Sequence, residues 1–236
     1  MIIDFNKIHL GSSSQGKLNE YASFGLNVKQ KLLPDMPEVL GTDQEVITYK
    51  AITFGANILV EDTSLDVEGE AVGINVKYLL SELKTNPKYD GKKAVWTVWL
   101  GLIYDDFLYL VKSQINGKLS STNANDIAFG FDAVFIPDSS LLTLAQLDNI
   151  NQKHNFSARK SALTNMIIGN YTVVIQINSI KPWTGLYQNT DIVSNKDHNI
   201  KRNNQIKSMM HWCENCSAHK MCKECEELYM DMNRYG

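Results

Sequence analysis

A long hairpin pattern inside a chain of interleaved helices and strands restricts this sequence to few folds. Apolar residues alternate with others through residues 93–113, KAVWTVWLGLIYDDFLYLVKS, on both sides of Asp105 and Asp106, which predicts two long antiparallel strands. Segments with a helical spacing of apolar residues lie before and after it, at residues 15–25, 43–54, 74–85 and 157–169. Because a hairpin excludes a purely parallel sheet, we predict an α/β fold of two lobes, in which helices flank a mixed, elongated sheet with a central cleft.

Two adjacent carboxylates interrupt another apolar strand pattern. The segment LVEDTSLDVEG, residues 59–69, belongs to a strand that we expect to span Ile58 to Val60 and to deliver Glu61 and Asp62 to its end. Burying an unpaired carboxylate is costly, so this placement favours a site where a cation or a proton compensates the charge. A solvated strand terminus explains these residues equally well, and both readings stay open at this point.

The composition excludes several classes of protein. The chain has 236 residues, of which 44% are hydrophobic, with a formal net charge of −3 and a pI near 6.0. No global basic field marks it for nucleic acid or for an anionic membrane. No stretch approaches the ~18 uninterrupted apolar residues of a membrane span, and the first residues lack the pattern of a signal peptide. We therefore expect a cytoplasmic protein that binds neither membrane nor nucleic acid.

The composition also divides the chain into three parts. Residues 1–186 carry the interleaved helix and strand patterns and form the predicted main domain. Residues 187–207 are rich in Asn, Asp and Lys, which is typical of a polar linker. Residues 208–236 hold all four cysteines, so no disulfide can brace the main domain.

The four cysteines have the spacing of metal ligands. Cys213, Cys216, Cys222 and Cys225 form C-x2-C-x5-C-x2-C, two chelating pairs that suit one tetrahedral Zn²⁺. So short a region has no adequate core, and a structural zinc would supply its folding energy. Disulfides and free thiols remain the alternatives. The methionines and tyrosines of this tail predict either a docking surface for a partner protein or packing on the main domain.

Six polar segments stand at predicted strand ends or helix starts, where α/β proteins usually assemble their sites. They are GSSSQGK (11–17), PEVLGT (37–42), VEDT (60–63), GINVK (73–77), FGFD (129–132) and KHNFSAR (153–159). The segments supply carboxylates for a divalent cation, lysines and small hydroxyl residues for phosphates, and an aromatic ring for a base. Together they predict a nucleotide site.

The order of these segments resembles the inosine triphosphate pyrophosphatase (Ham1-like) family, which hydrolyses non-canonical purine nucleoside triphosphates to monophosphate and pyrophosphate. The resemblance runs from Lys7 to Leu163. It rests on Pro37-Glu38, LVEDTSL, FGFDAVFIPD followed by LAQL, and Lys153 with Ser157 and Arg159. It implies a Mg²⁺-dependent hydrolase that forms a homodimer.

The resemblance also implies a role for each matching residue. Asp62 would orient or deprotonate the attacking water. Glu38 would bind the Mg²⁺ that bridges the triphosphate, with Glu61 close by, and Glu38, Glu61 and Asp62 together are the implied metal ligands. The residues that would face the phosphates are Ser12, Ser14, Lys17, Lys77 and Lys153. The residues that would hold the purine are Phe129, stacked on its ring, and Asp132, Ser157 and Arg159 near its 6-keto edge.

Ordinary structural roles compete for some of these residues. Phe129 lies in a strand pattern, where a large aromatic side chain usually belongs to the core. Lys17 and Lys77 lie on predicted helices and would commonly be solvated. Arg159 at a helix start gains nothing from the helix dipole, which favours an anion or a keto oxygen opposite it.

Three departures from the family pattern open a second reading. Ser12, Ser13 and Ser14 stand in place of Thr-Gly-Asn, AVGINVK lacks the usual Pro-Gly, and Ala158 replaces the histidine of Ser-His-Arg. All three fall in the predicted substrate site. The alternative function is a nucleotide sensor, which holds a deoxyinosine-type triphosphate with little or no cleavage and signals through a partner, as such domains do in bacterial antiviral defence.

Overall fold

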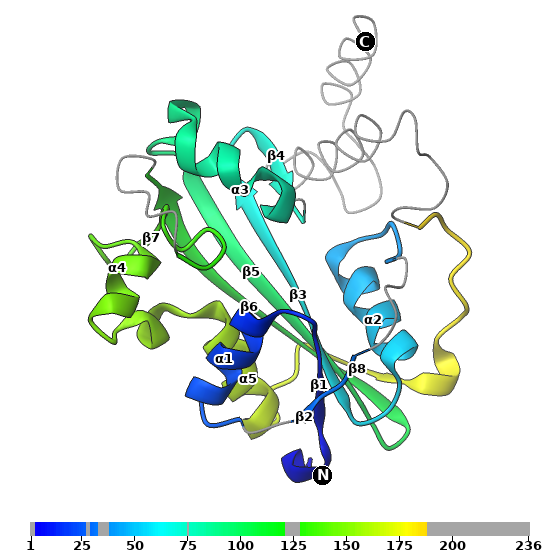
Figure 1. The fold of residues 1–236 in the computed structure, drawn as a ribbon. Coiled ribbons are helices and arrows are strands. Elements are labelled where there is room, and N and C mark those ends of the chain that lie inside the picture. Colours follow the sequence, from blue (N-terminus) through cyan, green and yellow to red (C-terminus); the bar gives the residue numbers. More distant parts are fainter. Residues whose placement is uncertain (1–2, 27–28, 33–37, 75, 121–127, 188–236) are drawn as a thin grey trace, which may run out of the picture. The chain divides into compact units, whose positions relative to one another are not determined.

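The computed structural model describes residues 3–187 except 27–28, 33–37, 75 and 121–127, and of residues 77–78 it describes the backbone alone (Figure 1). The chain forms two compact units. The first unit contains the described residues up to Thr63, Thr97–Ile115 and those from Gln146 onward. The second contains Ser64–Trp96 and the described part of Asn116–Ala145.

Helices and strands are interleaved along the chain, as predicted. The strands are β1 His9–Gly11, β2 Lys29–Gln30, β3 Ile58–Val67, β4 Glu70–Gly73, β5 Lys93–Tyr104, β6 Phe107–Leu119, β7 Phe135–Pro137 and β8 Val173–Gln176. The α-helices are α1 Gln15–Ser23, α2 Asp43–Phe54, α3 Val76–Thr85, α4 Leu144–Asn149 and α5 Ala158–Ile168. None of the described helices is long and apolar enough to cross a membrane.

All the described strands belong to one mixed sheet. Its order is β2-β1-β3-β5-β6-β7, with β4 paired to β3 and β8 paired to β6. β1 runs parallel to β2 and β3, whereas β6 runs antiparallel to β7 and β8. β5 and β6 form the predicted hairpin, and Asp105 in its turn has a φ of 50°. The predicted α/β class and mixed sheet are therefore confirmed.

In the first unit, α2 packs on one face of the sheet. Its Ile47 and Ala51 join a buried cluster that also contains Ile58, Val60, Trp99, Ile103, Leu108 and Leu110. The helix approaches β5 closely at Gly101, where a Cβ atom would lie 3.3 Å from the Cβ of Ala51. Thr42 and Glu45 form a capping box that fixes where α2 begins.

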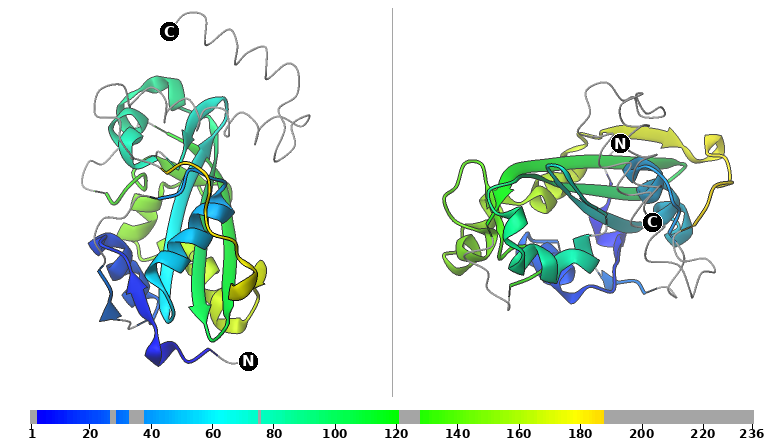
Figure 2. Two further views of the ribbon diagram at one scale, coloured as in Figure 1. Left: turned by 90° about the vertical axis from the view of Figure 1, so that its right-hand side faces the viewer. Right: turned by 90° about the horizontal axis from the view of Figure 1, so that it is seen from above.

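The first unit also contains α1 and α5, which lie together to the left of β3 in Figure 1, whereas α2 lies to its right. Each of these two helices begins with a serine cap. The Ser14 hydroxyl accepts from the backbone N–H of Lys17, and the Ser157 hydroxyl accepts from that of Lys160. Gly169, with a φ of 79°, ends α5 in the left-handed region. Figure 2 gives two further views of these helices and the sheet.

The second unit has its own aromatic core. Phe131 and Phe135 pack edge-on against Trp96, with ring centroids 5.7 and 6.4 Å away. From the sequence we expect GFDAVFIPD to be a strand that ends at Pro137. This prediction is wrong over its first part, because residues 130–134 form turns and only β7 is extended. Gly130 has a φ of 57°, which a strand does not accommodate. The turns bring the backbone N–H of Asp132 to the carbonyl of Phe129.

The strand that carries the two acids is longer than predicted. We expected it to end at Val60, but β3 continues to Val67. Residues beyond Asp62 keep the β pattern because Leu65 and Val67 are buried and pair with β4. Glu61 and Asp62 therefore lie inside a strand, and their environment depends on which face of the sheet each one meets.

Candidate active site

Glu61 and Asp62 of β3 point to different partners. Successive side chains of a strand project to opposite faces of a sheet. Glu61 contacts residues of α1 and α5, whereas Asp62 contacts Lys50 of α2. The strand thus separates two groups of charged side chains within the first unit. We call them the Glu61 cluster (Lys17, Glu20, Tyr21, Glu61, Lys153 and Arg159) and the Asp62 cluster (Glu38, Lys50 and Asp62).

Arg159 is the main partner of Glu61. The guanidinium donates from Nε to one carboxylate oxygen at 2.7 Å and from Nη2 to the other at 2.8 Å. Both side chains are almost fully buried, at 3% and 1% exposure. This side-on, bidentate geometry is the strongest that an arginine and a carboxylate adopt.

Three further donors complete the surroundings of Glu61. The Tyr21 hydroxyl lies 2.6 Å from Oε2, the Thr63 hydroxyl 2.7 Å from Oε1, and Lys17 Nζ 3.1 Å from Oε1. Burial and the neighbouring Glu61 raise the pKa of Tyr21 well above its usual value, so its hydroxyl remains a donor at neutral pH. Glu61 therefore meets hydroxyl, ammonium and guanidinium donors from three directions.

Glu20 of α1 is the second acid of the Glu61 cluster. It accepts from Lys153 and from Nη1 of Arg159, so it links α1 both to the 3-10 helix Lys153–Phe156 and to α5. Lys153 is buried, as a lysine is only when an acid pairs with it. The cluster contains three basic side chains and two acids, which leaves it one positive charge in excess.

The Asp62 cluster has the opposite charge balance. Lys50 Nζ lies 2.5 Å from Glu38 Oε1 and 3.5 Å from Asp62 Oδ1, so two acids share one ammonium group. Burial raises the pKa of Asp62, and the charge of Lys50 offsets this only in part. Burial lowers the pKa of Lys50, but Asp62 and Glu38 outweigh burial and raise it. The cluster thus has one negative charge in excess and already accommodates a cation.

The serine loop before α1 is held by its own hydrogen bonds. The Ser12 hydroxyl accepts from the backbone N–H of Ser14 at 3.2 Å, and the Ser12 carbonyl accepts from Gln30 Nε2 at 2.6 Å. The Ser14 hydroxyl caps α1 at 3.4 Å from the N–H of Lys17. These hydrogen bonds fix the start of α1 and so help to place Lys17 in the Glu61 cluster.

The predicted site residues fall into both units. The first unit brings together Lys17, Glu61, Lys153 and Arg159, with Ser157 as the cap of α5, and separately Glu38 with Asp62. It does not gather the three predicted metal ligands, because Glu61 meets the other cluster. Lys77, Phe129 and Asp132 belong to the second unit. There Phe131 is buried but Phe129 is 41% exposed, and Asp132 is buried.

The sequence reasoning missed Lys50, Glu20 and Tyr21. A signal for Lys50 was available, since it lies between Ile47 and Ala51 on a helix whose apolar face covers the sheet. Glu20 stands three residues after Lys17 and therefore on the same side of α1. Nothing in the sequence singles out Tyr21, because a buried aromatic residue on a helix needs no polar partner to explain it.

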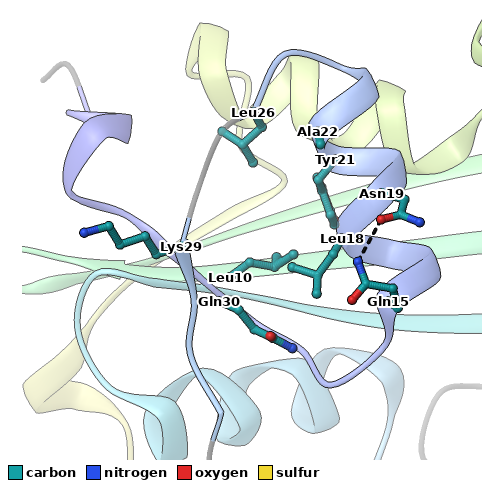
Figure 3. A pocket seen from close by; sticks show the side chains of 9 residues that line it. All are labelled: Leu10, Gln15, Leu18, Asn19, Tyr21, Ala22, Leu26, Lys29 and Gln30. Atoms are coloured by element: carbon teal, nitrogen blue, oxygen red, sulfur yellow. Dashed lines mark hydrogen bonds between the residues drawn. The ribbon is translucent and has the colours of Figure 1, made fainter.

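A cavity of about 470 Å³ lies beside α1 in the first unit (Figure 3). Leu10, Leu18 and Leu26 line it together with Ala22 and the ring of Tyr21, and Gln15, Asn19, Lys29 and Gln30 add polar groups. Gln15 donates to Asn19 at 2.8 Å across its rim. No acid lines the cavity, and of the residues in the two charged clusters it shares only Tyr21.

The predicted zinc ligands, Cys213 to Cys225, lie outside the described residues. Within the part of the chain that the structure describes, no group of three or more His, Cys, Asp or Glu side chains is arranged to hold a metal ion. The Asp62 cluster supplies two acids, and a hydrated ion that takes few protein ligands matches such a pair.

Known proteins resemble this chain in sequence and in fold. A dITP/XTP pyrophosphatase of Aliarcobacter butzleri (strain RM4018) is 26% identical over 196 residues, which cover 66% of this chain and 94% of that protein. A dITP/XTP pyrophosphatase of Pyrococcus horikoshii is 25% identical over 174 residues, covering 66% of this chain and 92% of that protein. A HAM1 protein structure from Coxiella burnetii matches with a TM-score of 0.53 at 20% identity, over 69% of this chain and 97% of that one.

A family model also matches more than half of the chain. The model described as the Ham1 family matches residues 8–168, a range that includes α1, α2, β3 and α5 with both charged clusters. The similarity to the solved structure adds the same fold. This chain belongs to the Ham1 family.

Proposed function

We propose that this protein hydrolyses non-canonical purine nucleoside triphosphates of the ITP, dITP and XTP type to the monophosphate and pyrophosphate. The observation that carries the proposal is the pair of oppositely charged clusters that β3 separates. An acidic pair suits a metal ion, and a group with excess positive charge suits a triphosphate. The names of the sequence relatives, dITP/XTP pyrophosphatase, support this substrate class.

Asp62 is the proposed base of the reaction. Its carboxylate would orient the attacking water and accept its proton. A carboxylate whose pKa is raised by burial is a better base for this purpose than one with an ordinary pKa. Lys50 would keep this carboxylate in place beside Glu38, and Lys17 would stabilise the charge that develops on the phosphate oxygens.

Glu38 and Asp62 are the proposed ligands of Mg²⁺. Both already point at one positive group, the ammonium of Lys50, so the pair fits a cation without rearrangement of the backbone. Bound Mg²⁺ would neutralise charge on the triphosphate. We leave Glu61 out of this pair, because its two oxygens accept from Arg159, Tyr21, Thr63 and Lys17.

The remaining predicted residues keep their proposed roles. Ser12, Ser14, Lys77 and Lys153 would face the phosphates. Phe129 would stack on the purine, in accord with its 41% exposure, and Asp132, Ser157 and Arg159 would read the 6-keto edge.

One set of measurements tests the proposed reaction. Purified protein with Mg²⁺ is titrated with dITP, ITP, XTP, dATP and dGTP by calorimetry, and the same samples are assayed for pyrophosphate. We expect rapid release from dITP, ITP or XTP that disappears in Asp62→Asn. The exposed Asp148 of α4 provides the matched control, because Asp148→Asn removes an acid of the same type that belongs to neither charged cluster. Equal release from Asp62→Asn and wild type would contradict the proposal.

A sensor is the second candidate function. Ala158 is fully buried at the start of α5 and offers a methyl group beside the proposed base-reading residue. An imidazole at that position would supply a hydrogen bond that a methyl group cannot. Tight binding of dITP with little pyrophosphate would favour the sensor, and absence of nucleotide binding would exclude both functions.

We also propose that Cys213, Cys216, Cys222 and Cys225 hold one structural zinc, and that the tail contacts a partner protein. The expected result is one equivalent of zinc by elemental analysis, lost when Cys213 and Cys216 are both changed to serine. The homodimer that the family resemblance implies is a further proposal, and light scattering on the same sample measures it.

A further inference from the structure

The packing of Tyr21 in α1 accounts for its ring but not for its hydroxyl. The side chain is 1% exposed, and its ring lines the cavity of Figure 3, where a phenylalanine would fill the same space. The hydroxyl, however, lies 2.6 Å from Glu61 Oε2. A hydrogen bond from a hydroxyl to a carboxylate at this distance is charge-assisted and strongly directional.

The orientation of the Glu61 carboxylate determines the orientation of Arg159. Arg159 donates to both oxygens of Glu61, so the planar guanidinium lies close to the plane of the carboxylate. That plane would otherwise rotate about the last bond of the Glu61 side chain, a torsion with broad preferences. Tyr21 donates to one oxygen and Thr63 to the other, which fixes the rotation from both sides.

We propose that Tyr21 is a positioning residue, which acts through Glu61 to hold the Arg159 guanidinium in the orientation that distinguishes a 6-keto from a 6-amino purine. The inference rests on the proposed function, because it takes Arg159 to be a group that reads the base. It adds a residue of α1 to base recognition, although Tyr21 itself touches Glu61 and not the nucleotide.

Tyr21→Phe is the direct test, because it removes one hydroxyl and keeps the buried ring. We expect discrimination between dITP and dATP, measured as the ratio of dissociation constants with Mg²⁺ present, to fall about tenfold. Where pyrophosphate is released, the ratio of kcat/KM values should fall with it. Tyr89→Phe is the matched control, because Tyr89 is also buried and its hydroxyl lies 3.1 Å from an acid, Glu82, outside both clusters.

The orientation of Arg159 can be followed without any nucleotide. The chain has three arginines, Arg159, Arg202 and Arg234, so its Nε–H signals in a nitrogen-15 spectrum are few, and Arg159→Lys assigns the one of interest. The Arg159 Nε–H is buried and hydrogen-bonded, so its exchange with water should be slow. We expect Tyr21→Phe to accelerate this exchange roughly tenfold and Tyr89→Phe to leave it unchanged.

A double-mutant cycle separates positioning from general loosening of the fold. In an Arg159→Lys background, Tyr21→Phe should change discrimination by less than twofold, since no guanidinium remains to be oriented. Full discrimination in Tyr21→Phe, or the same loss in both backgrounds, would overturn the inference while the wild type still binds dITP. A wild type that binds neither nucleotide would instead overturn the proposed function, whatever the exchange rates show.

Discussion

Lys50 Nζ lies 3.5 Å from Asp62 Oδ1, on the face of β3 away from Arg159. The same ammonium contacts Glu38 at 2.5 Å. Asp62 therefore shares its nearest counter-charge with the second proposed metal ligand. Lys50 keeps two like charges close together at a place where they would otherwise repel each other.

The first prediction concerns Lys50→Met. Without the ammonium, the pKa of Asp62 should rise further, because burial and Glu38 both raise it and Lys50 opposes them. We expect pyrophosphate release to fall about 100-fold at neutral pH, with the acidic limb of the pH profile displaced upward. Lys112→Met is the control, because Lys112 contacts the ring of Trp99 in the same unit and no acid in the cluster. An unchanged acidic limb would contradict the role of Lys50.

The second prediction concerns stability and pH at Asp62. A carboxyl whose folded pKa is raised adds stability at acidic pH, and this contribution is lost as pH rises through its folded pKa. In buffer without divalent ions, the Tm of Asp62→Asn should therefore be higher than that of the wild type at pH 7.5. This difference in Tm should become smaller toward pH 4. Scanning calorimetry at several pH values measures it. A difference that grows on acidification would show that the pKa is lowered instead.

The third prediction concerns the buried pair of Glu61 and Arg159. Arg159→Met leaves the buried Glu61 and the partly buried Glu20 without the guanidinium that they share. Removing one partner of a buried ion pair costs ~3–5 kcal/mol of unfolding free energy. Urea denaturation measures the loss.

A surface pair provides the comparison for Arg159→Met. Lys88 also contacts two acids, Glu70 and Glu82, but its side chain is 44% exposed. Lys88→Met should therefore cost no more than ~1 kcal/mol. Equal losses from the two variants would mean that burial of the Arg159 pair has little energetic effect.

The fourth prediction concerns Gly101 of β5, on which α2 packs. A methyl group there would lie 3.2 Å from Ile47 Cγ1 and 3.3 Å from Ala51 Cβ, so α2 would have to shift. We expect Gly101→Ala to lower the unfolding free energy by about 1–3 kcal/mol. Activity should fall too, because α2 carries Lys50. A stable but inactive variant would show that the helix moves without loss of packing.

Periodicity in the sequence was sufficient to predict much of the fold. The hairpin of β5 and β6, the helices α2 and α5, and the mixed sheet follow from apolar spacing and from caps such as Ser157 and Gly169. The predicted end of β3, at Val60, was wrong, because pairing with β4 keeps the residues after Asp62 extended. The pattern of residues within one segment does not reveal which strand it pairs with.

The candidate site was harder to predict than the fold. The polar segments were found by residue type. The two-residue period of a strand places Glu61 and Asp62 on opposite faces of the sheet, but this rule applies only once β3 is known to continue past Val60. Lys50, Glu20 and Tyr21 were missed because none of them lies in one of the six polar segments. Their significance depends on partners distant in sequence, such as Glu61, which lies 40 residues after Tyr21.

The capping box of α2 has a consequence for how this chain can change in length. Thr42 and Glu45 fix the first turn, and Lys50 follows two turns later at a set angle around the helix axis. Deleting one residue between Glu45 and Lys50 would turn the ammonium by about 100° and move it away from Asp62. Adding four residues would return it nearly to the same side but about 6 Å further along the axis. Insertions and deletions among functional relatives should therefore fall before Thr42 or after Gly55, and spare the helix between them.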